Sequence, residues 1–132
     1  MLNHVQRTYA LAKAHLETLQ DEENEVDRKY IADHHIINAD GTTPRAAWAI
    51  DDDEIADKAI DETAKIVEDS GLWAEILAAR ELLKAAEVEL IKYGLEIMPP
   101  AYAGEKAALQ RAAEKDYTTR QKMIDLTMRL DV

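Results

Sequence analysis

The feature that most constrains this chain is a run of mostly apolar residues, spaced alternately three and four apart, over its first 37 residues. Its members are Leu2, Val5, Tyr9, Ala12, Leu16, Leu19, Glu23, Val26, Tyr30, Asp33 and Ile37, two of which are acidic. This is the spacing of heptad a and d positions, which lie along one side of an α-helix. The run therefore predicts one long helix over residues 2–37 with an apolar seam.

Three further helices are expected, over residues 52–69, 72–98 and 105–130. The acidic run Asp51-Asp52-Asp53-Glu54 suits a helix start, because aspartate caps free N–H groups and acids favour the positive end of the helix dipole. Ser70-Gly71 and Pro99-Pro100 supply the breaks between the last three helices. The four helices predict an all-α fold, for which an antiparallel four-helix bundle is the simplest arrangement.

The connection over residues 38–51 is expected to be a loop, since it contains Asp40-Gly41 and Thr43-Pro44. A short apolar stretch within it, Arg45–Ile50, is expected to form either a helical turn or an extended piece that covers the end of the bundle with Trp48. No segment alternates with period two for long enough to predict a strand. Residues 1–132 are therefore expected to form a single helical domain.

Composition excludes several classes of function. The chain has no Cys, which removes disulfides, thiolate nucleophiles and Cys-bound metals, and its one Ser leaves little room for a serine nucleophile. Its longest stretch without a charged residue, Ile97–Gly104, is far shorter than the roughly 20 apolar residues of a membrane span. The N-terminal residues also lack the apolar core of a secretory signal. We therefore expect a cytoplasmic protein with no membrane contact.

The charge is strongly acidic and unevenly distributed. The chain has 27 Asp and Glu against 16 Lys and Arg, a net charge of −11, and residues 17–69 alone hold 17 acids and 5 bases. Such a field repels nucleic-acid phosphates, so no direct nucleic-acid binding is expected. One alternative function follows from the same charge: carboxylates that imitate phosphates and block a basic, nucleic-acid-binding partner.

Two acidic motifs form the enzymatic alternative. Glu22-x-x-Glu25 and Glu54-x-x-Asp57 fall on the first two expected helices, with 28 residues between them. They resemble the E-x-x-E, E-x-x-D signature of all-α nucleoside triphosphate pyrophosphatases, the MazG-like and phage dUTPase families. The resemblance covers residues 22–57 and implies four carboxylates that bind Mg²⁺ and activate water for attack on a nucleotide phosphate. On the second helix, however, both acids lie opposite the apolar face, which favours a solvated surface.

A compact cluster, Asp33-His34-His35, is the other candidate for metal binding. Neighbouring residues on a helix point about 100° apart, which disfavours ligation of one metal by both imidazoles. No His follows residue 35, so a hydrolase of the HD type lacks its later ligands. A histidine that hydrogen-bonds near the helix end, where a cation suits the dipole, is the preferred interpretation.

The leading hypothesis is a non-enzymatic helical protein–protein interaction module, with no catalytic residue and no cofactor. The expected first helix is much longer than the second, so part of its seam should stay exposed and recruit a partner. We expect self-association as a homodimer or higher oligomer, and a phage or mobile-element origin is compatible with the composition. The candidate contact residues are Leu16, Leu19, Val26, Tyr30, Trp48 and Tyr102.

Overall fold

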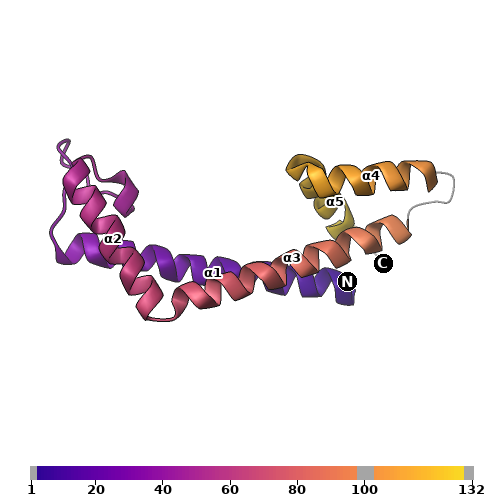
Figure 1. The fold of residues 1–132 in the computed structure, drawn as a ribbon, viewed down its shortest axis with the longest axis horizontal. Helices are drawn as coiled ribbons and strands as arrows, with labels where there is room; N and C mark the ends of the chain where they lie inside the picture. The colour runs from indigo at the N-terminus through magenta and orange to yellow at the C-terminus, as the bar shows by residue number, and fades with distance from the viewer. Residues whose placement is uncertain (1–2, 98–102, 130–132) are drawn as a thin grey trace. The chain divides into compact units, whose positions relative to one another are not determined.

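The computed structural model describes residues 3–97 and 103–129, with side chains in the second range from residue 107 onward. Its elements are α1 (His4–Asp33), the short 3₁₀ helix η1 (Ala47–Ala49), α2 (Asp53–Asp69), α3 (Leu72–Glu96), α4 (Ala103–Lys115) and α5 (Tyr117–Met128) (Figure 1). These ranges contain no strand and hold five α-helices. The fold is all-α as expected, but the antiparallel four-helix bundle is not confirmed.

The chain forms two compact units. Unit 1 takes its residues from 1–14 and 80–132, and unit 2 consists of residues 15–79. Both α1 and α3 therefore contribute one part to each unit, whereas α2 and η1 belong to unit 2 and α4 and α5 to unit 1. Among the described helices, none combines the length and the apolar character needed to cross a membrane.

The first helix begins at a capping box formed by Asn3 and Gln6. The Gln6 backbone N–H donates to Asn3 Oδ1 at 2.9 Å, and the Asn3 N–H donates to Gln6 Oε1 at 3.0 Å. This reciprocal pair satisfies two N–H groups that helical carbonyls cannot reach. Side-chain hydrogen bonds thus specify the start of α1 at His4.

The same helix ends at Asp33, four residues before the expected limit at Ile37. His35 adopts a left-handed backbone with φ of 52° and donates its N–H to the carbonyl three residues earlier, while Ile36 N–H donates to Ile31 O at 3.1 Å. These two bonds form a Schellman motif, in which Ile36 also packs against the cluster that holds Ile31. The chain reverses there, so Ile37 lies outside the helix and is exposed.

The second helix is bounded by residues that the sequence marks clearly. Asp52 is its N-cap and accepts a hydrogen bond from Ile55 N–H at 3.0 Å. Gly71 follows its C-terminus with φ of 83°, a left-handed conformation that costs glycine little. The hydroxyl of Ser70 then accepts from the Leu72 N–H at 3.3 Å, which places the start of α3.

The last expected helix, over residues 105–130, is instead two helices separated at Asp116. The Asp116 carboxylate accepts from Thr118 N–H at 3.1 Å and from Thr119 Oγ1 at 2.7 Å, and it caps α5. These bonds favour the charged carboxylate and lower the pKa of Asp116. An extended backbone at this residue ends α4, and α5 turns away from the line of α4 (Figure 1).

Unit 1 is built around one apolar cluster drawn from four helices. Its buried members are Tyr9, Ala86, Leu90, Ile91, Leu95, Ala113 and Ile124. Within this unit Thr127 of α5 touches two other helices: its carbonyl accepts from the fully buried Gln6 Nε2 at 2.7 Å, and its Oγ1 lies where it would collide with a β-carbon on Gly94. Glycine at position 94 therefore permits the close approach of α3 and α5.

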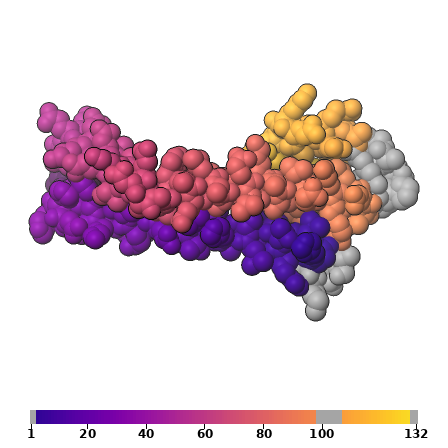
Figure 2. All heavy atoms as spheres, turned by 60° about the horizontal axis from the view of Figure 1, so that its bottom comes forward, coloured from indigo at the N-terminus to yellow at the C-terminus, as the bar shows by residue number. Residues whose placement is uncertain are grey.

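Unit 2 has a separate cluster between α1, α2 and the connection that joins them. Its buried members are Tyr30, Ile31, Ala47, Ile50, Ala56 and Ala59. Three of these six residues are alanines, which allow α2 and η1 to approach closely. In the space-filling view the magenta atoms of α2 lie directly against the purple atoms of α1 (Figure 2).

Candidate functional site

The four carboxylates of the pyrophosphatase resemblance, Glu22, Glu25, Glu54 and Asp57, are all exposed in unit 2. Glu25 is paired with Arg28, one turn further along α1. Nowhere in residues 3–97 and 103–129 do three His, Cys, Asp or Glu side chains gather closely enough to hold a metal ion. The four acids are therefore not brought together as the resemblance requires.

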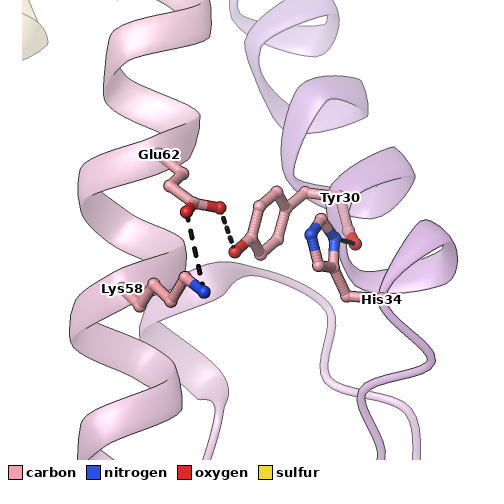
Figure 3. A network of polar contacts seen from close by, with 4 residues as sticks. All are labelled: Tyr30, His34, Lys58 and Glu62. Atoms are coloured by element: carbon pink, nitrogen blue, oxygen red, sulfur yellow. Dashed lines mark hydrogen bonds and ion pairs between the residues drawn. The ribbon is translucent and has the colours of Figure 1, made fainter.

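Tyr30 lies at the centre of a polar network that joins α1 to α2 (Figure 3). Its hydroxyl donates to Glu62 Oε2, while the other Glu62 oxygen lies 3.9 Å from Lys58 Nζ. His34 stacks on the Tyr30 ring with centroids 3.9 Å apart, and its Nδ1 lies 2.9 Å from the Tyr30 carbonyl oxygen. The histidine thus hydrogen-bonds at the helix end. The bond to Glu62, together with burial and the negative charge of Glu62, raises the pKa of Tyr30 to about 12.

The candidate contact residues divide into buried and exposed groups. Leu16, Leu19 and Tyr30 are buried within this chain, so the expectation of an exposed seam at these positions does not hold for the single chain. Val26 is half-buried, and Trp48 is 65% exposed. Tyr102 lies outside the described residues.

Of the two expected forms of the stretch Arg45–Ile50, the structure has the helical turn, η1, and its Trp48 is exposed. Ala47 at the start of η1 and Ile50, the residue that follows η1, are both buried. The indole between them is directed outward, where the Arg45 guanidinium lies 4.9 Å from the ring centroid. Ala47 and Ile50, and not the indole, therefore belong to the buried apolar cluster of unit 2.

The exposed indole borders a concavity of unit 2, which we call the tryptophan groove. It has a volume of about 480 Å³ and is lined by Glu23, Asn24 and Asp27 of α1, Ala46, Ala47 and Trp48, Ile60, Thr63, Ala64, Val67 and Glu68 of α2, and Trp73 of α3. Trp73 is 38% exposed and Ile60 42% exposed. Both tryptophans of the chain therefore line one groove, beside an exposed isoleucine.

Side-chain hydrogen bonds hold the wall that carries Trp48. Asp27 Oδ2 accepts from the Ala47 N–H at 2.9 Å, which ties η1 to α1. Asn38 bridges the connection, because its Nδ2 donates to Ala49 O at 3.2 Å and its Oδ1 accepts from Asp51 N–H at 3.1 Å. The groove wall is thus fixed on both sides of the indole before any ligand binds.

A second groove, of about 720 Å³, also involves α1 and α2. Its lining carries both signs of charge: Lys29 and Lys65, together with Asp33, Glu62 and Asp69, around Val26, Tyr30, His34 and Ile66. The ionisable lining residues of the tryptophan groove, in contrast, are Glu23, Asp27 and Glu68, all of them acidic. The two grooves therefore suit ligands of different charge.

Comparison with known proteins adds no family and no relative. No family model matches the chain, and no curated protein or solved structure is significantly similar to it. The candidate site is therefore identified from the geometry of its own residues alone.

Proposed function

We propose that this chain is a non-enzymatic protein–protein interaction module that receives its partner in the tryptophan groove of unit 2. The observation that carries the proposal is the pairing of Trp48 and Trp73, which are 25 positions apart in the sequence and line one concavity while remaining partly exposed. Tryptophan is among the residues that contribute most to protein interfaces, because it buries a large area at low entropic cost.

Three further features support a binding surface. Ile60 adds an exposed aliphatic side chain to the same lining. Asp27 and Asn38 fix the wall in advance, which lowers the entropy that binding must remove. The rest of the lining is largely apolar and includes Ala46, Ala47, Ala64 and Val67.

The test compares captured partners between surface variants. A tagged wild-type chain and the Trp48→Ala/Trp73→Ala variant are each used to capture proteins from the native host. Ile37→Ala/Leu77→Ala is the matched control, because both side chains are exposed, belong to unit 2 and lie outside the groove. We expect a defined protein to be retained by the wild type and the control and lost from the tryptophan variant. Equal retention by all three would contradict the proposal.

We further propose self-association through exposed apolar side chains outside the tryptophan groove. Unit 1 carries several of these, namely Leu11, Leu82, Val88 and Leu126. Their free energy of burial favours contact with another apolar surface. Light scattering over a concentration series should give a mass that rises above the 14.9 kDa of one chain. A constant mass of one chain would exclude self-association and leave the groove proposal intact.

A further inference from the structure

The charge of the tryptophan groove indicates the class of partner it receives. Its three ionisable lining residues, Glu23, Asp27 and Glu68, are all acids, and no Lys, Arg or His lines it. The neighbouring groove between the same two helices has lysines among its acids. Electrostatic complementarity therefore favours a basic ligand in the tryptophan groove and disfavours an acidic one.

The indoles suit the same chemistry. The guanidinium of Arg45 already lies over the Trp48 ring at 4.9 Å, so one face of this indole is occupied by a cation of the chain itself. A cation over an aromatic face is attracted by the negative potential of the ring. Indole, carboxylate and an apolar floor that includes Ile60 and Val67 together match a ligand with both large apolar and cationic side chains.

The backbone of the groove limits how such a ligand can bind. Its walls are formed by α1, α2, α3 and η1, and the described residues of unit 2 contain no strand. A peptide therefore finds no sheet edge to extend, and its recognition depends on side chains. This favours a segment that presents apolar and basic side chains together on one face.

We infer that the tryptophan groove binds a protein segment that combines large apolar side chains with Arg or Lys. The inference rests on the proposed function and adds the chemical class of the partner. Unit 2 of a second copy fits poorly as the ligand at this groove, because residues 17–69 hold 17 acids against 5 bases. The occupant that we infer is a basic segment of a different protein.

The experiment selects ligands without assuming their sequence. A phage library of random peptides that lack Trp is selected on the full-length chain, with prior removal of phage that bind Trp48→Ala/Trp73→Ala. The best peptides are synthesised and titrated against the chain by intrinsic fluorescence. Because both tryptophans of the chain line this groove, a change in emission reports on the groove itself.

Two charge variants then separate the effect of the groove carboxylates on affinity from the effect of the overall negative charge. Glu23→Gln/Glu68→Gln removes two acids of the groove, one on α1 and one on α2. Glu22→Gln/Glu54→Gln removes two exposed glutamates from the same helices outside it, so the net charge changes equally. We expect peptides rich in Arg or Lys and large apolar residues. Their affinity should fall about thirtyfold or more without the tryptophans and several-fold in the groove variant, with little change in the control.

The outcomes distinguish the inference from the proposed function. Peptides that need both tryptophans but carry no excess of basic residues would overturn the inference and leave the interaction module standing. The same holds if the two glutamate variants bind equally well. If no enriched peptide depends on Trp48 and Trp73, both the inference and the groove as a binding site are wrong.

Discussion

Unit 1 and unit 2 each surround an apolar cluster, but different contacts determine their geometry. In unit 1 the specific contact is buried and joins two helices, because the Gln6 amide donates to the Thr127 carbonyl. In unit 2 one specific contact likewise joins two helices, since Tyr30 of α1 bonds to Glu62 of α2. Further bonds fix the connection after α1, where Asp27 of α1 and Asn38 bond to backbone groups on both sides of Trp48. Unit 1 is therefore specified by contacts between helices, whereas unit 2 also depends on its loop, which carries part of the proposed binding surface.

The strongest way to test this comparison is to open a cavity in each cluster separately. Leu90→Ala in unit 1 and Ile31→Ala in unit 2 both remove a side chain that is almost completely buried. Each should lower the free energy of unfolding by about 2–5 kcal/mol. Hydrogen exchange measured by mass spectrometry should show faster exchange mainly in the altered unit. Equal acceleration in both units by either variant would show that they unfold as one body.

The next largest effect should come from the buried amide of unit 1. Gln6→Ala leaves the Thr127 carbonyl without this donor and also removes the capping bond that Gln6 Oε1 accepts, and we expect a loss of about 1–3 kcal/mol. Asn3→Ala removes the other capping bond alone, the one that Asn3 Oδ1 accepts, and should cost about 1 kcal/mol. Urea unfolding followed by circular dichroism measures both. If the two variants lose the same stability, the buried bond contributes nothing beyond a capping bond.

Gly94→Ala tests the close approach of α3 and α5. The added methyl group would collide with Thr127 Oγ1, at a typical overpacking cost of about 1–3 kcal/mol, offset by about 1 kcal/mol from the better helix propensity of alanine. In a Thr127→Ala background the nearest remaining side-chain atom is the β-carbon at 3.4 Å, so the same substitution should become neutral or stabilising. Thermal unfolding of the wild type, the two single variants and the double variant gives the coupling free energy between positions 94 and 127. If the effects of the two substitutions on stability simply add, the added methyl group does not press on Thr127, and the surrounding structure relaxes to accommodate it.

Much of the local structure could be predicted from the sequence. The Asp52 cap and the Gly71 turn are short-range features, and the structure has them where the residues indicate. The break at Asp116 is also readable, since aspartate is among the preferred N-cap residues, but the apolar pattern alone hides it. Periodicity alone likewise predicts a first helix that reaches Ile37, because the spacing of the apolar residues does not reveal the left-handed backbone at His35 that ends the helix.

The candidate site was less accessible to prediction, for a physical reason. A heptad seam shows which side of a helix is apolar but not what covers it, so Leu16 and Leu19 were assigned to a partner although this chain buries them. The tryptophan groove needs Trp48 and Trp73 to line the same concavity. That pairing depends on the Asp27 and Asn38 bonds of an irregular loop, which no periodicity encodes.

A smaller effect should follow from loosening the loop of unit 2. Asn38→Ala removes both bonds that bridge the connection and should cost about 1 kcal/mol, because each neutral hydrogen bond contributes modestly. The result that matters is local: amides of residues 39–51 should exchange faster, while those of unit 1 should not change. Peptide affinity at the tryptophan groove should fall with it. Unchanged exchange over 39–51 would show that the loop does not depend on Asn38.

The smallest effect, and the one with a distinctive pH dependence, concerns Tyr30. Tyr30→Phe removes the hydrogen bond to Glu62 and should lower stability at pH 8 by about 0.5–1.5 kcal/mol. The folded pKa of Tyr30 is about 12 against an ordinary value of 10.0, so between these values the unfolded chain releases the proton first. The stabilisation is therefore complete below pH 10 and is lost as the pH rises towards 12.

Urea midpoints of the wild type and Tyr30→Phe, measured from pH 8 to pH 11, isolate this residue from the other four tyrosines. The stability advantage of the wild type should be constant up to about pH 9.5 and then narrow, because only the wild type has an ionisable group at position 30. Tyr117→Phe serves as the matched control, since this ring is exposed and lies in unit 1. If the stability difference between the wild type and Tyr30→Phe stays constant to pH 11, the bond to Glu62 does not raise the pKa of Tyr30. The contact that Tyr30 makes between α1 and α2 is then apolar stacking alone.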